Sequence, residues 1–256
     1  HPILATDVYE RALWPMPTDP AVESNYVFYS GLGTVFDKTT GLEWLRTSSK
    51  QTFSREGAVQ WCRDLRLGGH KDWRLPSRIE MWSVVDFASK PRIGGNLGST
   101  AGLTAVPIFD APPLTTDDAK FWLTTFGWDS TGKERSLPFQ VTLSNGAMTT
   151  ATGFESTKNA AFCVRSASKP DVNPQFRIEG DIVHDRVAKV AWQRTMPTES
   201  MTGAAATAYC KKLTLQGASG FRLPTLKELV AIIEPTRRSP AMDVTVFPVE
   251  ASYSSS

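Results

Sequence analysis

A stretch of sequence occurs twice in this chain, at a constant offset of 148 residues. A dozen identities share this register without a gap: Trp44, Arg46, Thr47, Ala58, Cys62, Leu65, Leu67, Gly69, Arg74, Leu75, Pro76 and Glu80 recur as Trp192, Arg194, Thr195, Ala206, Cys210, Leu213, Leu215, Gly217, Arg222, Leu223, Pro224 and Glu228. A period of about 150 residues is too long for a solenoid repeat and matches one domain. The repetition therefore predicts tandem copies of one fold.

Composition narrows the class of protein. With 256 residues, of which 41% are hydrophobic, the chain can bury one or two ordinary cores. No apolar run approaches the roughly 18 residues of a membrane span, and the start has no basic region followed by an apolar core, so we expect a chain that does not span a membrane and whose signal peptide, if any, is already removed. A net charge of +2 and a pI near 8.4 are too mild for a dedicated nucleic-acid binder.

Local patterns divide the chain into four parts. Residues 1–25, rich in proline and acids, predict an N-terminal extended arm; residues 26–168 form the first domain, 169–175 a linker and 176–256 the second domain. In the first domain we expect strands at Val35–Phe36, at Leu42–Arg46, over 120–126, 138–143 and 147–151, and around Cys163. Residues 88–119 have many glycines and prolines and predict one long loop, which in a compact domain is usually functional.

Two helices are expected in each repeat. Ser54 caps the first, whose apolar stripe comprises Ala58, Trp61, Cys62 and Leu65, and residues 202–213 repeat that helix. Ser77 and Glu80 have the spacing of a capping box that opens the second helix, and Thr225 and Glu228 repeat it.

The three cysteines are placed in an orderly way. Cys62 and Cys210 occupy the same point of each repeat, and Cys163 comes just before the first repeat ends. We predict a Cys62–Cys163 disulfide, which would place the protein outside the cytoplasm. Buried free thiols in a cytosolic protein are the open alternative. Cys210 has no partner in this chain.

Several motifs resemble the Lcl C-terminal domain family, named for a bacterial collagen-like adhesin. The resemblance rests on Gly33-Thr34-Val35 with Asp37, on Gly41-Leu42-x-Trp44, on Ala58-x-x-x-Cys62, on Leu67-Gly68-Gly69, on Asp72-Trp73-Arg74-Leu75-Pro76 and on Cys163-Val164-Arg165. The R-L-P-[ST]-x-x-E element is also similar to one in formylglycine-generating enzymes and other C-type-lectin-like folds. Repeat 2 departs from the pattern, with Phe221 for Trp73 and Lys189 for Gly41.

This resemblance implies a fold and a place of action. The implied fold is α+β, with two tandem C-type-lectin-like domains that each pack two helices on a small twisted antiparallel sheet. Family members are secreted or surface-attached bacterial proteins, some implicated in adhesion to sulfated polysaccharides. The implied function is therefore non-enzymatic adhesion or surface recognition in an extracytoplasmic location.

The repeated aromatic and arginine residues have two interpretations. Trp44 with Trp192, and Trp73 with Phe221, could offer faces on which sugars stack, but aromatic residues at repeat-equivalent positions favour core anchors. Arg74 and Arg222, which precede Leu75-Pro76 and Leu223-Pro224, could bind an anion. We prefer a structural role in which each guanidinium bridges carbonyls or a carboxylate such as Asp37 or Asp185.

Both helical halves are basic. The segment from Arg46 to Arg78 contains eight basic and three acidic residues. The segment from Tyr209 to Arg238 contains six basic and two acidic residues. This pattern predicts weak binding of a polyanionic glycan or a host or cell-surface ligand, with the loop 88–119 contributing; a solvated helix face is the plain alternative. The candidate ligand-binding residues are Arg55, Arg63, Arg66, Lys71, Lys211 and Lys212.

Catalysis and metal binding are not expected. The three histidines, His1, His70 and His184, have no zinc-binding spacing, and the chain lacks C-x-x-C, G-x-S-x-G and Walker sequences. We predict no enzyme activity, no cofactor and no metal site. Two minor alternatives stay open: copper at His1 if that residue is a true N-terminus, and calcium near Asp117, Asp118 and Asp129. An enzyme on a C-type-lectin-like fold remains the least favoured function.

Repeat 2 stops early, since Tyr253 aligns with Trp122. We therefore expect unpaired strand edges and an uncovered apolar face, completed by a further segment of the same precursor or by another subunit. An arbitrary boundary behind a self-sufficient core is the alternative. The runner-up function is a structural subunit of a bacterial surface assembly or fibre that binds protein partners.

Overall fold

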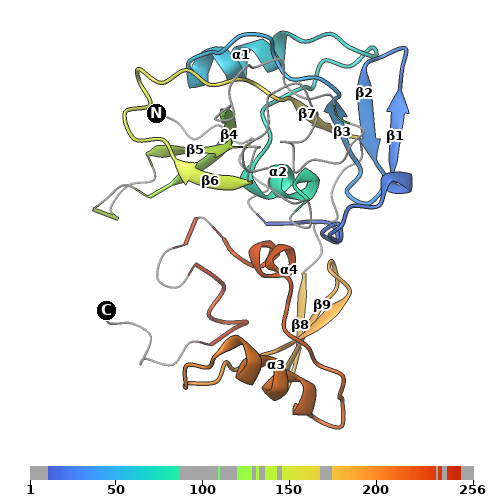
Figure 1. Ribbon diagram of the computed structural model, residues 1–256, viewed down its shortest axis with the longest axis vertical. Coiled ribbons are helices and arrows are strands. Elements are labelled where there is room, and N and C mark those ends of the chain that lie inside the picture. The colour runs from blue at the N-terminus through green and yellow to red at the C-terminus, as the bar shows by residue number, and fades with distance from the viewer. Residues whose placement is uncertain are drawn as a thin grey trace. The chain divides into compact units, whose positions relative to one another are not determined.

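The computed structural model describes residues 11–86, 109, 120–128, 131–132, 136–142, 146–167, 175–234, 236–237 and 241–248. The chain divides into two compact units (Figure 1). The first comprises His1–Glu10 and Met16–Pro170, and the second comprises Arg11–Pro15 and Asp171–Ser256. Part of the predicted N-terminal arm therefore groups with the second unit, where the Arg11 guanidinium lies 3.1 Å from the Glu234 carboxylate.

The first unit is built on a four-stranded antiparallel sheet. A short 3-10 helix, η1 (Glu23–Asn25), leads into β1 (Tyr26–Tyr29), and β2 (Thr34–Asp37), β3 (Leu42–Leu45) and β7 (Val164–Ser166) follow in the sheet order β1-β2-β3-β7. Strand β7 comes from the end of the domain and pairs Val164 with Trp44 and Ser166 with Leu42. The closing strand thus covers the edge that the first three strands would otherwise expose.

Two helices in the first unit begin where their sequences predict. Ser54 caps α1 (Arg55–Asp64) by accepting the Gly57 amide, and α1 buries Ala58 and Cys62. Ser77 and Glu80 form the predicted capping box at the start of α2 (Arg78–Val84). Because α2 is buried along nearly its whole length, this capping box lies inside the domain rather than at its surface.

A second sheet belongs to the same unit, whereas we expected one sheet per domain. Its order is β4-β5-β6, with β4 (Lys120–Gly127), β5 (Leu137–Thr142) and β6 (Ala147–Thr150) antiparallel. Strand β4 is hydrogen-bonded to the start of α2. The Thr124 amide donates to the Pro76 carbonyl, and the Arg78 amide donates to Thr125 Oγ1. The core around these contacts buries Trp44, Trp73, Trp122 and Phe121.

The second unit repeats the first half of this plan. A three-stranded antiparallel sheet of order β10-β9-β8 comprises β8 (Phe176–Glu179), β9 (Ile182–Asp185) and β10 (Val190–Gln193). Helix α3 (Gly203–Lys212), capped by Thr202, and helix α4 (Leu226–Ala231), with the Thr225–Glu228 capping box, follow. Strands β9 and β10 and helix α3 lie at the same 148-residue offset as β2, β3 and α1.

The two units differ in how many of their side chains are buried. Helix α3 buries no residue, whereas α1 buries two. Leu223, Leu226 and Leu229 are 39%, 49% and 40% exposed, but Leu75, the counterpart of Leu223, is 1% exposed. The core of the second unit comprises Val183, Ile232 and Phe247, with Phe176, Trp192, Met242 and Val246 packed against them. In the described residues the second unit therefore leaves exposed an apolar face that the first unit buries.

Some expectations fall outside the part of the chain that the structure describes. These are the loop 88–119 apart from Phe109, nearly all of the linker 169–175, and the residues around Tyr253. Phe109 is buried and packs edge to face against Trp44 and Phe162. One residue of the predicted functional loop therefore belongs to the core.

Candidate functional site

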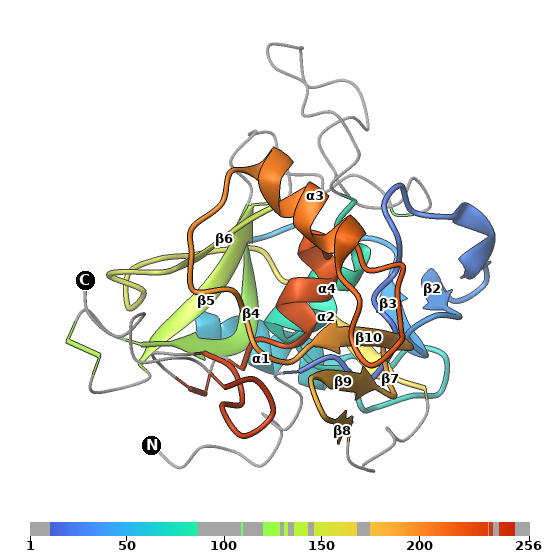
Figure 2. The same cartoon turned by 90° about the horizontal axis from the view of Figure 1, so that it is seen from below.

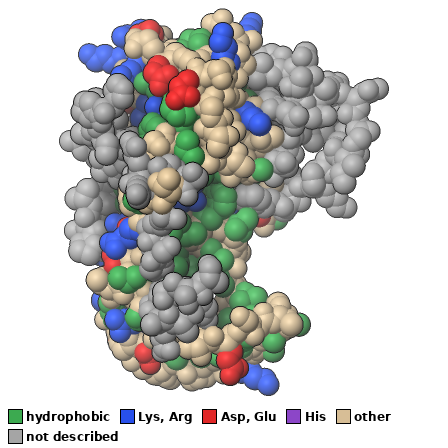
Figure 3. All heavy atoms as spheres, turned by 90° about the vertical axis from the view of Figure 1, so that its left-hand side faces the viewer, with side chains coloured by type: hydrophobic (Ala, Val, Ile, Leu, Met, Phe, Trp, Pro, Cys, Tyr) green, Lys and Arg blue, Asp and Glu red, His purple; other side chains and the backbone are tan. Residues whose placement is uncertain are grey.

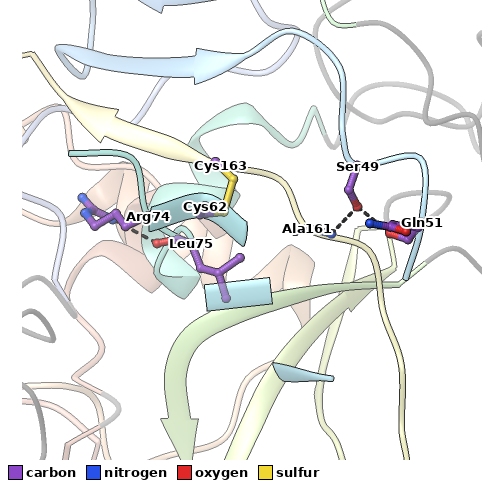
Figure 4. The surroundings of a disulfide bond; sticks show 7 residues. All are labelled: Ser49, Gln51, Cys62, Arg74, Leu75, Ala161 and Cys163. Atoms are coloured by element: carbon purple, nitrogen blue, oxygen red, sulfur yellow. Dashed lines mark hydrogen bonds between the residues drawn. A yellow bond between two sulfur atoms is a disulfide. The ribbon is translucent and has the colours of Figure 1, made fainter. Parts of the chain in front are cut away.

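A disulfide joins Cys62 of α1 to Cys163, the residue before β7, as the sequence predicts (Figure 4). The two cysteines are 101 residues apart in the sequence. Closing a loop of this length stabilises the folded state by about 4–5 kcal/mol in the chain-entropy model. Beside the disulfide, Ser49 exchanges hydrogen bonds with Ala161: the Ser49 amide donates to the Ala161 carbonyl and the Ala161 amide donates to Ser49 Oγ, both at 2.9 Å. Residues 159–163 are thus hydrogen-bonded to the end of β3 and to the segment that joins β3 to α1.

Cys210 is the counterpart of Cys62 and is a free, partly exposed thiol. It lies on α3; both α3 and β10 are labelled in Figure 2. Gln193 Nε2 of β10 donates a hydrogen bond to Tyr209 Oη of α3 at 2.7 Å. No strand other than β9 pairs with β10 among the described residues. Among the described residues, β10 thus has no counterpart of β7 beside it.

An ion-pair cluster around Arg165 was not predicted from the sequence. The Arg165 guanidinium lies 2.8 Å from Glu43 and 2.9 Å from Asp72, and Thr34 Oγ1 donates to Glu43 at 2.7 Å. Burial acts to raise the pKa of Asp72, but the hydrogen bond and the charge of Arg165 outweigh it, so that this pKa lies below its ordinary value. The cluster ties β7 to β3 and to the segment before α2, which is a structural role.

Arg74 and Arg222 each hold the glutamate of the capping box that follows. Arg74 Nη1 is 2.7 Å from Glu80, and Arg222 Nη1 is 2.8 Å from Glu228; both also donate to the carbonyl of the next leucine. The structural role is as we expected, but the carboxylates suggested for it are wrong. Asp37 instead accepts the amides of its own turn, at Thr39 and Thr40, and Asp185 does the same at Val187 and Ala188.

The aromatic residues shared by the repeats do not offer sugar-stacking faces in the first unit. Trp44 and Trp73 are both fully buried. Trp192 packs edge to face with Phe247 in the core of the second unit. These side chains serve as core anchors.

The eight basic residues from Arg46 to Arg78 separate into a group that packs within the domain and an exposed group. Arg46 lies over the Phe28 ring, and Arg55 lies over the Phe126 ring while donating to the Thr124 carbonyl. Arg74 and Arg78 also pack within the domain. The exposed group comprises Lys50, Arg63, Arg66 and Lys71. Arg55 therefore lies apart from the three other candidates proposed for this unit.

Arg63 and Arg66 stand together at the end of α1. Arg66 Nη1 donates to the carbonyls of Arg63 and Leu65, both at 2.8 Å. In the second unit Lys211 and Lys212 are exposed in the last turn of α3. On the face seen in Figure 3, Lys and Arg side chains are interspersed with acidic and neutral ones and form no continuous patch. Binding of an anion here would rest on small local groups of cations.

Metal ligands do not gather in the described residues, where no group of three or more His, Cys, Asp or Glu side chains could hold an ion. His1, Asp117, Asp118 and Asp129 lie outside that part of the chain. Among the described residues no helix is long and apolar enough to cross a membrane.

Comparison with known proteins identifies one family. The model of the Lcl C-terminal domain matches residues 33–165 and again residues 181–256, which together make up most of the chain. No curated protein and no solved structure matches. The first match ends at Arg165, the centre of the ion-pair cluster, and the second covers the strands β9 and β10 with both helices of the second unit.

Proposed function

The chain belongs to the Lcl C-terminal domain family, and we propose that it is a non-enzymatic recognition protein that acts at the bacterial surface or in the extracellular medium. Two observations support this proposal. The family match indicates a surface-associated, adhesin-like role, and the Cys62–Cys163 disulfide suits an oxidising compartment outside the cytoplasm. We further propose that the two matched segments are tandem copies of one C-type-lectin-like domain.

The proposed ligand is a polyanionic surface such as a sulfated glycan. The observation that carries this proposal is a group of exposed cations at equivalent helix ends. These are Arg63 in the last turn of α1, Arg66 just after it, and Lys211 and Lys212 in the last turn of α3. Cations at a helix C-terminus also interact favourably with the helix dipole, so their position alone has a structural explanation. Lys71 extends the first group, and the loop 88–119 remains a candidate contact.

Charge reversal separates the two explanations. The double variant Arg63→Glu/Arg66→Glu should lose retention on heparin. Exposed charges act only within a Debye length of about 8 Å at physiological salt, so cations elsewhere on the chain cannot replace these two. The matched control is Lys38→Glu/Lys158→Glu, which changes the net charge equally at two other exposed lysines. We expect the control to elute close to wild type. If both double variants elute early by the same amount, net charge rather than this group governs retention, and the proposed site is wrong.

The alternative proposal is a structural subunit of a surface assembly that binds protein partners. Exposed apolar side chains on α4 and on the segment before it favour this alternative, since large exposed apolar areas usually mark interaction sites. Light scattering of the purified chain tests it: concentration-dependent self-association supports a subunit, and a monomer at all concentrations favours recognition of a separate ligand.

A further inference from the structure

The backbone that carries Arg66 is held on both sides. On the side of α1, Cys62 is fully buried and joined in the disulfide. On the other side, the Leu67 carbonyl accepts the His70 amide at 3.0 Å and Nε1 of the buried Trp73 at 3.5 Å. The Arg66 side chain itself is exposed. An exposed cation is thus attached to a backbone that is tied to the core of the first unit.

The end of α1 also holds the guanidinium of Arg66. Nη1 donates to the carbonyls of Arg63 and Leu65, both at 2.8 Å, which uses both of its protons. Nε and Nη2 make no hydrogen bond with the described residues. Their two parallel N–H groups lie on one edge of the planar guanidinium, and we call this pair the fork of Arg66. Such a fork matches two oxygens of one sulfate, phosphate or carboxylate group.

The charge of Arg66 is not neutralised by a carboxylate of the described residues. The two acids nearest to it in the sequence have other partners. Asp64 accepts from Gln60 Nε2 at 2.9 Å, and Asp72 lies 2.9 Å from the Arg165 guanidinium. The fork therefore carries an uncompensated positive charge at the surface.

Arg66 differs in this respect from the exposed cations near it. Among the described residues, the side chains of Arg63 and Lys71 have no hydrogen-bond partner that would fix their charged groups. Ordering such a side chain when a ligand binds costs conformational entropy, and a group that is already ordered avoids this cost. Arg66 is thus the preorganised member of the group.

The second unit has the same helix end without the guanidinium. Helix α1 ends at Leu65 with φ −60° and ψ 135°, and α3 ends at Leu213 with φ −62° and ψ 130°. The residue after each cap is Arg66 in the first unit and the exposed Thr214 in the second. The two helix ends therefore form a natural matched pair that differs at the position of the fork.

We propose that Arg66 is the specificity-determining residue of the exposed cations. Its Nε and Nη2 bind two oxygens of one oxyanion group of the ligand, a sulfate ester or a carboxylate, while Nη1 stays bound to the helix end. This inference rests on the proposed function only for the nature of the ligand, a polyanionic glycan. Arg63 and Lys71 contribute charge, and Lys211 and Lys212 act as point charges, because an ammonium has no planar fork.

Variants of the full chain that keep the charge test the role of the fork. Arg66→Lys removes the fork, and Arg63→Lys is the matched control at a neighbouring exposed arginine. We expect Arg66→Lys to weaken binding to immobilised heparin at least about threefold, because two charge-assisted hydrogen bonds are lost, and the control to bind like wild type. Equal affinities of the two variants would overturn the assignment to Arg66 and leave the proposed glycan binding in place.

A gain of function in the second unit tests the same point without altering Arg66. Because the two helix ends have the same backbone, Thr214→Arg places a guanidinium beside the carbonyls of Lys211 and Leu213. Thr214→Lys adds the same charge without a fork. We expect the arginine variant to bind heparin more tightly than the lysine variant. Equal gains would show that charge alone governs binding at this position, against the proposal.

Inorganic sulfate tests the fork apart from any glycan. Sulfate replaces chloride at constant ionic strength, and the Nε–H signals of the arginines are followed by NMR. We expect a saturable shift for Arg66 and none for Arg63. If Arg66 responds in this way but the chain does not bind heparin, the proposed glycan is wrong and the fork is confirmed. If the Arg66 signal does not shift, the fork binds no oxyanion, and the inference fails even when heparin is retained.

Discussion

The glutamate of the capping box occurs in this molecule in two environments that differ mainly in burial. Glu80 and Glu228 each accept from the backbone amide of the cap residue at 2.7 Å and from the arginine six residues earlier. The Glu80 side chain is 1% exposed, and that of Glu228 is 17% exposed. The same two contacts can therefore be compared inside and outside a core.

We predict that Glu80→Ala destabilises the first unit far more than Glu228→Ala destabilises the second. Removing one partner of a buried ion pair costs about 3–5 kcal/mol. We expect a smaller loss here, because Arg74 is 25% exposed and keeps its hydrogen bonds to the Leu75 carbonyl and Ser166 Oγ. Loss of a solvent-accessible helix cap costs about 1 kcal/mol. Hydrogen exchange with peptide resolution measures each unit separately. Equal losses in the two units would mean that burial does not set the value of this contact.

Glu228 also gives the second unit an acid-sensitive contact. The hydrogen bond from Arg222 lowers the pKa of Glu228 below its ordinary value of 4.5, against the opposing effect of partial burial. A lowered pKa in the folded state means that the stabilisation is present above the ordinary pKa and is lost as the pH falls through the folded-state pKa. Carboxyl titration by NMR should find the low pKa in the wild type and a higher one in Arg222→Met. An unchanged pKa in that variant would contradict the assignment of the cause.

At the scale of elements, features set by residues close in sequence could be predicted, whereas most contacts between distant residues could not. The caps at Ser54, Ser77 and Thr225 were predicted because their partners lie three residues away. Strand β1 was missed because its four residues do not alternate between buried and exposed. The Arg165–Glu43 pair spans 122 residues and carries no local spacing signal. The disulfide was predicted over a similar distance because cysteine has few other uses in such a domain.

The turn between β9 and β10 is strained where the turn between β2 and β3 is not. Gly41 has a φ of 69°, and its counterpart Lys189 has a φ of 58°, a left-handed conformation that costs a residue with a side chain about 1–2 kcal/mol.

We therefore predict that Lys189→Gly stabilises the second unit by up to about 1 kcal/mol, the relief of strain being partly offset by the greater freedom of glycine in the unfolded chain. Guanidinium denaturation followed by hydrogen exchange in β9 and β10 measures the gain. The reverse substitution, Gly41→Lys, is the matched control and should destabilise the first unit. A Lys189→Gly variant less stable than wild type would show that the lysine side chain contributes more than the strain costs.

At the scale of the whole molecule, the two units share two paired strands and a helix at a constant offset and differ in what else they contain. The first has β7, the disulfide and the sheet β4-β5-β6 behind α2. The described part of the second has three strands, two helices and a three-residue buried cluster, together with the short N-terminal piece Arg11–Pro15. Since burial of apolar surface is the main stabilising contribution to folding, the two units should not be equally stable.

We predict that amides of α3 exchange at least about tenfold faster than those of α1 under native conditions, because local opening is cheapest where few side chains are buried. The two helices have equal lengths and side-chain caps, so α1 serves as the control inside the same molecule. If α3 proves as well protected as α1, the number of buried side chains on a helix does not set its local stability in this protein.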